Sequence, residues 1–268
     1  MNIIVLMKQV PDTEAPVEIA ESKDRLDTED LKWAINPYDE YALEEALLIK
    51  EASDDDVTVT VVSVGPDRLS EAFRVAYAMG VDNAIHVNDE VDDEVFGAVD
   101  SYTTSKIIAK LLEETPYDLI ISGFRAVDDD NYQVPAFISE FLNIPMISLV
   151  VKQEISNDSI TCEQSIDGGI AVVKAQLPVL ITAQKGLNEP RYPAFRAIMK
   201  AKKRKVDERE IEDIGLSVEE VGVTGAKTKI RSLSYPPKRA EGKLVEGNSA
   251  AEKAEELVRL LREEACVI

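Results

Sequence analysis

Apolar runs and amphipathic stretches alternate along the first 151 residues of the chain. The apolar runs are rich in β-branched residues and lack a polar face, which is typical of strands buried on both sides. We predict such strands over residues 3–8, 57–64, 84–87, 119–122 and 146–151. The stretches between them carry apolar residues at helical spacing, and they predict helices over residues 38–52, 69–79, 101–114 and 133–142.

Strands that alternate with helices of this length indicate an α/β fold. We expect a doubly wound, mostly parallel sheet with helices on both faces, in which ligands bind beyond the carboxyl ends of the strands. After residue 151 the pattern changes to shorter β segments. A hairpin is predicted over residues 152–156 and 159–164, followed by strands over residues 170–175 and 179–182.

The last quarter of the chain differs from the rest. Residues 206–245 have scattered turn signals and too few apolar residues for a core of their own. An amphipathic helix is predicted over residues 249–264. We therefore divide the chain into an α/β domain, residues 1–205, and a C-terminal arm and helix, residues 206–268, which need the surface of a partner.

Charge and composition exclude several classes of protein. Asp and Glu outnumber Lys and Arg by 51 to 30, which gives a net charge of -21 and argues against nucleic acid or an anionic membrane as a partner. No run of 18 or more apolar residues occurs, so we expect no membrane-embedded segment. The two cysteines, Cys162 and Cys266, fit a reducing compartment, and the first residues form a strand pattern rather than a signal peptide. We expect a cytoplasmic protein.

A candidate nucleotide-binding loop lies at residues 123–133, between a predicted buried strand and a predicted helix. Backbone donors at the start of a helix suit a phosphate group. Arg125 can pair with the phosphate, and Asn131 and Gln133 can hydrogen-bond a ribose or a base. The alternative is a solvated acidic loop that caps its helix, because three consecutive aspartates lie in it.

The residues before the first long helix allow two interpretations. The segment 36–39 can contact the same nucleotide, or Asn36 can cap the helix that begins near Tyr38. By spacing alone the cap is favoured.

A second unusual segment combines prolines, an aromatic residue and positive charge. Pro190 and Pro193 fix the backbone angle φ, Phe195 presents a large apolar side chain, and a cationic run follows at residues 200–205. A stiff loop with an aromatic anchor beside a local reversal of charge indicates a docking site for another protein. An ordinary surface loop before a lysine-rich helix is the alternative.

The sequence contains no recognisable catalytic constellation. Neither G-x-G-x-x-G nor G-x-x-x-x-G-K-[ST] occurs. His86 is the only histidine, so we expect no metal site. This absence agrees with a carrier or scaffold whose chemistry belongs to a bound cofactor.

Several segments resemble the β subunit of electron transfer flavoproteins, in the same order along the chain. These segments are residues 5–12, 35–46, 76–82, 123–133, 166–169, 187–192 and 198–203. The resemblance covers nearly the whole sequence and is least specific after about Val206.

The resemblance implies an electron-carrier subunit rather than an enzyme. Such a subunit forms a heterodimer with an α subunit and passes electrons from acyl-CoA dehydrogenase-type flavoenzymes to a membrane quinone reductase or another acceptor. FAD is shared and held chiefly by the α subunit, while the β subunit binds a nucleotide of its own. Domain 1–205 would bind that nucleotide, and residues 206–268 would dock on the α subunit.

The resemblance also implies two sets of residues. The nucleotide pocket would be lined by Leu6, Asn36, Pro37, Tyr38, Asp39, Val64, Gly123, Phe124, Arg125, Ala126, Val127, Asp128, Asp129, Asp130, Asn131, Tyr132, Gln133 and Val134. The partner-docking set would be Leu187, Asn188, Glu189, Pro190, Arg191, Tyr192, Phe195 and Met199, with Phe195 at an anchor position that is often aliphatic in the family.

The nucleotide is AMP in ordinary carriers of this family and a second FAD in electron-bifurcating ones, which oxidise NADH. Bifurcating β subunits tend to have glycine at the position of Asp129, so this chain favours AMP. Residues 8–12 and 134–135 look more like bifurcating sequences and keep the second FAD open. Two alternatives come from other classes. A universal-stress-type nucleotide-binding module is one, although its phosphate-binding glycine pattern is missing. An enzyme of the ATP-pyrophosphatase type is the other, although it would need a Ser-Gly-Gly-x-Asp-Ser-like loop at residues 8–11.

Overall fold

The computed structural model describes residues 1–91, 94–95, 100–238 and 242–268 of the chain. These residues form two compact units, Met1–Ser232 and Leu233–Ile268. Each unit is described by itself.

Among the described residues, nine strands form one sheet in the first unit, in the order β13-β12-β11-β14-β10-β1-β6-β7-β15. Their bounds are β1 (Asn2–Leu6), β6 (Thr58–Gly65), β7 (Asn83–Asn88), β10 (Leu119–Gly123), β11 (Met146–Ser156), β12 (Ser159–Ile166), β13 (Gly169–Gln176), β14 (Val179–Ala183) and β15 (Asp207–Arg209). All neighbours pair in parallel except β11–β12 and β12–β13, which pair antiparallel. The expectation of a mostly parallel sheet is confirmed.

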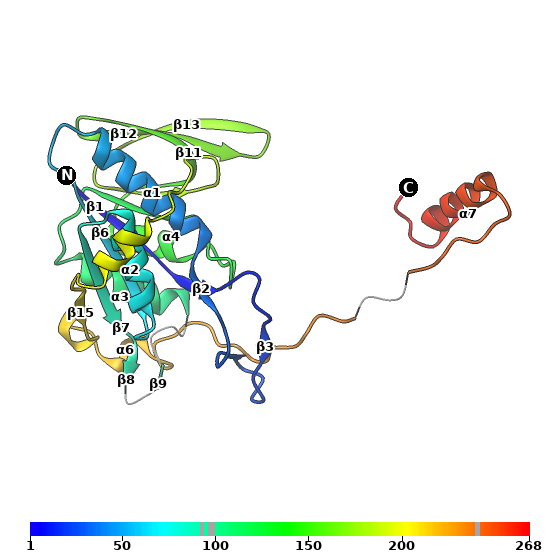
Figure 1. Ribbon diagram of the computed structural model, residues 1–268, viewed down its shortest axis with the longest axis horizontal. Helices are drawn as coiled ribbons and strands as arrows, with labels where there is room; N and C mark the ends of the chain where they lie inside the picture. The colour runs from blue at the N-terminus through cyan, green and yellow to red at the C-terminus, as the bar shows by residue number, and fades with distance from the viewer. Residues whose placement is uncertain (92–93, 96–99, 239–241) are drawn as a thin grey trace. The chain divides into compact units, whose positions relative to one another are not determined.

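Helices cover both faces of this sheet. Their bounds are α1 (Pro37–Ala52), α2 (Leu69–Met79), α3 (Ser101–Leu112), α4 (Val134–Leu142), α5 (Phe195–Ala201) and α6 (Val218–Val221), and Glu212–Ile214 form a 3₁₀ turn. Figure 1 shows α1 and α2 on one side of the strands and the antiparallel strands β11–β13 at one end of the sheet. Short two-stranded ribbons complete the unit: β2 (Gln9–Pro11) with β5 (Trp33–Ile35), β3 (Glu18–Ile19) with β4 (Leu26–Asp27), and β8 (Glu90–Val91) with β9 (Glu94–Val95).

The strands have no polar face because alternate side chains enter two different cores. In β1, Ile3 and Val5 pack with Leu43 of α1 and Phe73 of α2. Ile4, between them, packs on the opposite side with residues of α3 and α4. The continuous apolar runs of the sequence therefore reflect burial on both sides of the sheet.

The two strands expected over residues 146–151 and 152–156 form one strand, β11. The register of β11 shifts at a bulge near Leu149, which has φ of 55° and donates its N–H to Thr182 Oγ1 at 2.9 Å. β11 pairs in parallel with β14 as far as Val150, and from Val150 onward it pairs antiparallel with β12. One strand thus belongs to both the parallel and the antiparallel part of the sheet.

Residues 206–232 lie in the first unit rather than in a separate arm. Strand β15 extends the sheet beside β7, and Ile211, Ile214 and Val221 are buried in the core on the α3 side. The division of the structure after Ser232 therefore differs from the expected boundary at 205/206. Gly215 and Gly222 interrupt this short stretch of apolar residues, so it gives no long periodic signal.

Asp100 fixes residues 227–228 against the start of α3. One carboxylate oxygen accepts the N–H of Thr103 and completes a capping box, while the other accepts the N–H groups of Lys227 and Thr228 at 2.6 and 2.8 Å. Partial burial acts to raise the pKa of Asp100, but these hydrogen bonds outweigh it and hold the pKa below its usual value.

The second unit contains helix α7 (Ala250–Glu263), which the sequence predicts over 249–264. Ser249 caps it by accepting the N–H of Glu252 at 3.2 Å. None of its residues is buried, and Leu257 and Val258 are 45% and 43% exposed. The docking of this unit on a partner subunit stays a prediction. Within the described residues, no helix has the length and apolar character needed to cross a membrane.

Replacing Asp100 removes a helix cap together with two backbone contacts. We expect Asp100→Ala to lower the free energy of unfolding by about 1–2 kcal/mol at neutral pH, measured by urea denaturation. Because the folded-state pKa is depressed, the contribution is present above the unfolded-state pKa and is lost as the pH falls through the folded-state value. The variant and the parent should therefore converge in acid. Asp213→Ala, which removes an exposed carboxylate that accepts one backbone N–H, is the control; an Asp100 effect that persists unchanged in strong acid contradicts the assignment.

Candidate functional site

The candidate loop leaves β10 at Gly123 and enters α4 at Val134, at the carboxyl end of the central strands. The first turn of α1 lies directly against its start. A side-chain Cβ at position 123 would fall 2.5 Å from Asp39 Oδ1 and 2.7 Å from Tyr38 Cβ, so only glycine permits this approach. The close packing of α1 on β10 places the residues 36–39 and the loop in one site.

Asp39 joins the ends of two adjacent strands. Its Oδ2 accepts the N–H of Lys8, just past β1, at 2.7 Å, and its Oδ1 accepts the N–H of Gly123 at 2.8 Å. The side chain is buried, and burial raises its pKa to about 7 although both hydrogen bonds oppose the shift. Asp39 therefore contributes to the site by fixing the backbone of Lys8 and Gly123.

Asn36 occupies the N-cap position of α1, as the spacing favoured, and its carbonyl accepts the N–H groups of Asp39 and Glu40, but its side chain binds the loop instead of capping the helix. Its side chain makes no cap hydrogen bond. The amide nitrogen donates to the carbonyl of Arg125 at 2.8 Å, and the amide oxygen accepts the N–H of Val127 at 3.2 Å. An amide offers one donor group and one acceptor, which matches these two backbone groups. Pro37, whose φ is preset for a helix, begins α1.

An aromatic cluster surrounds the guanidinium of Arg125. The rings of Tyr38 and Phe124 meet edge to face at 4.4 Å, and Phe124 and Tyr132 lie 5.5 Å apart. Arg125 donates to the Tyr38 hydroxyl at 3.0 Å and to both carboxylate oxygens of Asp130. Hydrogen bonds to Tyr38 and Asp130 raise its pKa, so it stays a cation. Its buried Nε has no hydrogen-bond partner among the described residues.

Each of the three consecutive aspartates has a cationic partner. Lys8 Nζ lies 2.8 Å from Asp128 and 3.2 Å from Asp129, and Arg125 binds Asp130 at 2.7 Å. Sequence reasoning did not assign Lys8 to the site, since only the folded chain brings it to the loop. The acidity of the loop is thus largely compensated within the chain.

The backbone of the loop is strained and keeps free donors. Asp130 and Tyr132 both adopt the left-handed conformation, with φ of 56° and 61°. Such strain concentrates at binding sites, where the surrounding structure enforces it. The N–H groups of Asp128, Asp129, Tyr132 and Gln133 donate to no acceptor in the part of the chain that the structure describes. Free amides at the start of a helix, beside a guanidinium and aromatic rings, fit a nucleotide phosphate and its base.

The remaining residues assigned to the pocket lie at its base and its edges. Leu6 ends β1 and is buried in the core on the α3 side, and Val64 packs against that core. Asn131 Nδ2 lies 3.5 Å from Ser101 Oγ, and the carbonyl of Val134 accepts the hydroxyl of Ser105. Ala126 and Val127 are half-buried, and Gln133 is exposed at the start of α4.

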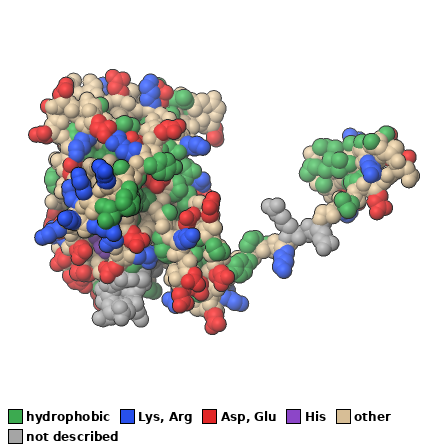
Figure 2. Space-filling view, viewed as in Figure 1, with side chains coloured by type: hydrophobic (Ala, Val, Ile, Leu, Met, Phe, Trp, Pro, Cys, Tyr) green, Lys and Arg blue, Asp and Glu red, His purple; other side chains and the backbone are tan. Residues whose placement is uncertain are grey.

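The segment assigned to docking divides into an inward and an outward part. Leu187 packs against the core, Asn188 hydrogen-bonds the backbone of Tyr41, and Arg191, whose charge we expected to serve a partner, pairs with α1. Pro190 is half-buried and Glu189 is exposed. The outward side chains are Tyr192, Phe195 and Met199, which are 98%, 76% and 48% exposed. On the face shown in Figure 2, Lys and Arg side chains gather beside hydrophobic ones over the region of α2 and α5.

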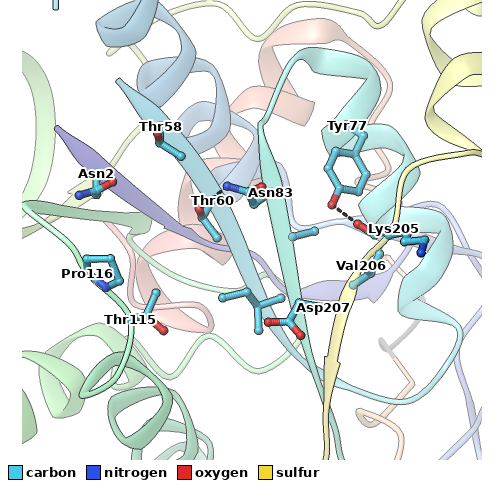
Figure 3. A pocket seen from close by; sticks show the side chains of 12 residues that line it. Asn2, Thr58, Thr60, Tyr77, Asn83, Thr115, Pro116, Lys205, Val206 and Asp207 are labelled. Atoms are coloured by element: carbon cyan, nitrogen blue, oxygen red, sulfur yellow. Dashed lines mark hydrogen bonds between the residues drawn. The ribbon is translucent and has the colours of Figure 1, made fainter. Parts of the chain in front are cut away.

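A cavity of about 430 Å³ lies at the opposite ends of the strands from the candidate loop. Asn2, Thr58 and Asn83 line it from the first residues of β1, β6 and β7. Figure 3 shows the Tyr77 hydroxyl at its rim donating to the carbonyl of Lys205, at 2.6 Å. Ligands of doubly wound sheets bind at the carboxyl ends, so this cavity is not part of the candidate site.

The fold and this loop define a doubly wound α/β protein with a candidate ligand site at its carboxyl edge. A family model described as the electron transfer flavoprotein domain matches residues 25–214. The chain is 41% identical to the electron transfer flavoprotein subunit beta of Bacillus subtilis (strain 168), with 100% of both chains covered. It is 38% identical to the subunit of that name from Thermoanaerobacterium thermosaccharolyticum, covering 92% of this chain and 93% of the relative. For Methylophilus methylotrophus the identity is 30%, with 98% of each chain covered. The chain therefore belongs to the electron transfer flavoprotein family, in its β-subunit branch.

The raised pKa of Asp39 predicts an unusual pH dependence. A buried acid whose folded-state pKa is about 7, against 3.8 in the unfolded chain, binds its proton more tightly when folded. Its contribution to stability is therefore largest below the unfolded-state value and declines as the pH rises to about 7. We expect the parent to lose up to roughly 4 kcal/mol relative to Asp39→Asn between pH 4 and pH 7.5, measured by urea denaturation.

Asp118→Asn is the matched control for this experiment. Asp118 also accepts a backbone N–H, that of Asn2 at 2.7 Å, but at the other end of the sheet. If the stability difference between the parent and Asp39→Asn does not change with pH, burial does not govern the protonation of Asp39.

Proposed function

We propose that this chain is the β subunit of a heterodimeric electron transfer flavoprotein. The full-length similarity to β subunits is the observation that carries the proposal. The chain then acts as an electron-carrier subunit with an α subunit as its partner, and it accepts electrons from acyl-CoA dehydrogenase-type flavoenzymes for a membrane quinone reductase or another acceptor. FAD, held chiefly by the α subunit, supplies the redox chemistry. A cytoplasmic location is part of the same proposal.

The candidate loop suits AMP better than a second FAD. Lys8 pairs with Asp128 and Asp129, and Arg125 pairs with Asp130, so the free backbone N–H groups of the loop are the donors that remain for a phosphate. A small group of amides beside one guanidinium matches one phosphate group. A dinucleotide would bring a second phosphate toward Asp129. Like charges about 5 Å apart repel by about 3 kcal/mol at an effective dielectric constant of 20, and the ion pair of Asp129 with Lys8 makes this value an upper limit.

Released nucleotides identify the ligand of this loop. We expect one FAD and one AMP per heterodimer after denaturation and chromatography. Asp129→Gly should raise the affinity for FAD by up to about a hundredfold, because it removes a charge that repels the pyrophosphate. Asp55→Gly, in the acidic turn after α1, is the control of equal charge. Two FAD and no AMP would instead support the electron-bifurcating alternative, in which the complex oxidises NADH.

The outward part of the segment 187–199 fits a docking site for a flavoenzyme. Tyr192, Phe195 and Met199 expose apolar surface beside Lys200 and Lys203, whereas the whole chain has a net charge of -21. An apolar anchor with a cationic border complements an apolar pocket with an acidic rim.

Removing the anchor should weaken docking without affecting folding. We expect Phe195→Ala in the heterodimer to lower the rate of electron transfer from an acyl-CoA dehydrogenase at least about tenfold, because a buried aromatic anchor contributes ~2 kcal/mol or more to binding. Thermal stability and flavin content should not change, since Phe195 is 76% exposed. Val172→Ala on β13, which is 71% exposed, is the control. Undiminished transfer by Phe195→Ala would remove Phe195 as the anchor.

The family match leaves a universal-stress-type module without support. That alternative explains neither the full-length similarity to β subunits nor the exposed aromatic segment.

A further inference from the structure

Two neighbouring glutamates on α1 are buried, which is unusual for a helix on the outside of a sheet. Glu44 is 4% exposed and Glu45 is 5% exposed. Burying two adjacent carboxylates is costly unless each is paired or hydrogen-bonded. Their partners therefore show what the structure gains from placing them there.

Glu44 binds Arg191, which lies in the segment 187–199 assigned to docking. Its Oε2 accepts the backbone N–H of Arg191 at 3.0 Å and the Nε–H at 2.8 Å, and its Oε1 accepts from Nη2 at 2.9 Å. Glu51, two turns further along α1 and exposed, binds the other side of the guanidinium at 2.6 Å. Arg191 is thus held by main chain and side chain at once, in the forked geometry that suits guanidinium and carboxylate.

Glu45 holds the same segment at a second point. Its Oε2 accepts from Asn188 Nδ2 at 2.7 Å, and the same amide group donates to the carbonyl of Tyr41 at 3.0 Å. Its Oε1 accepts from Gln153 Nε2, on β11, at 2.8 Å. Residues 188 and 191 are therefore both fixed to one helix by buried carboxylates.

The two fixed points lie directly before the exposed apolar residues. Tyr192, next to Arg191, is 98% exposed, and Phe195, which begins α5, is 76% exposed. An exposed aromatic residue on a fixed backbone loses little conformational freedom when a partner buries it, whereas one on a loose loop loses much. The buried glutamates contact the loop on the side that packs against α1.

We propose that Glu44 and Glu45 are positioning residues for partner docking: they hold residues 187–191 in one pose so that Tyr192 and Phe195 are presented ready for a flavoenzyme. The inference rests on the proposed function. It assigns to Arg191 the role of an internal anchor rather than that of a contact with the partner. Docking affinity then depends on residues that the partner never touches.

Glu44→Gln in the heterodimer tests this directly. The variant keeps the shape of the side chain but weakens its hold on Arg191. Hydrogen exchange of the amides in 187–195 should become faster, and the apparent KM for an acyl-CoA dehydrogenase should rise at least about fivefold. The kcat at saturating dehydrogenase and the FAD content should not change, because the bound geometry is the same once the loop is docked. A loss of stability alone would not produce this separation of KM from kcat.

Three further variants complete the test, the first as a control and the other two as independent checks. Glu51→Gln removes the exposed half of the Arg191 contact and should change KM less than about twofold, since exposed ion pairs contribute little. Arg191→Lys keeps the charge but loses the fork, so it should reproduce the rise in KM even if Glu44→Gln folds poorly. The double variant Glu44→Gln/Arg191→Gln should resemble the more affected single variant, because both changes remove one interaction.

The outcomes separate this inference from the proposed function. If Phe195→Ala weakens docking while Glu44→Gln and Arg191→Lys leave KM unchanged, the segment docks but its fixed pose is unimportant, and the inference is wrong. If Phe195→Ala also leaves KM unchanged, the docking role itself fails. A rise in KM without faster exchange in 187–195 likewise overturns the positioning role.

Discussion

The arrangement of both candidate sites depends on the two backbone hydrogen bonds that the buried side chain of Asp39 accepts. Two adjacent parallel strands, β1 and β10, end at this point, and each donates one backbone N–H to one oxygen of Asp39. Because Gly123 has no side chain, the first turn of α1 closes directly over the end of β10. The direction in which α1 leaves the sheet is set here, and so is the position of every side chain further along it.

Helix α1 consequently organises two segments that are far apart in the sequence. At its start, Asn36 holds the backbone of the loop that follows β10. A little more than two turns further along, Glu44 and Glu45 hold the segment that follows β14. Both segments follow parallel strands of the same sheet, and α1 covers those strands, so a single rigid helix sets the geometry of both sites.

Buried charge is costly, and α1 carries three buried carboxylates. The effective penalty for burying an ion is several kcal/mol, which hydrogen bonds offset only where the geometry is good. Asp39 receives two backbone N–H groups, and Glu44 receives three donors from Arg191. A helix that only covered a sheet would be more stable with apolar residues at these positions. The cost is understandable where loops must be held in one conformation, because charged acceptors fix backbone groups that apolar side chains cannot bind.

The sequence predicted the parts of this structure that depend on local pattern. Strands buried on both sides gave continuous apolar runs. The candidate site was placed from topology, since ligands of such sheets bind at the carboxyl ends, and its role stays a prediction. The sequence did not predict hydrogen bonds between residues that lie far apart along the chain. Asn36 binds the loop 89 residues later, and Arg191 binds Glu44, 147 residues before it. Strand β15 consists of three exposed charged residues and pairs through its backbone alone, so no hydrophobic pattern could reveal it.

The charge counted along a segment of the sequence also differs from the charge that the folded surface presents there. The aspartates of the loop after β10 look like a strongly acidic site, yet Lys8 and Arg125 pair with all three. The cationic run shows the opposite case: Lys200, Lys202 and Lys203 form no ion pair within the described residues. On a chain of net charge -21, a local group of unpaired cations produces a field that the rest of the surface opposes, so it attracts an acidic partner only at short range. Under the proposed docking role, that limits productive encounters to approaches that bring the partner to α5, next to the exposed side chain of Phe195.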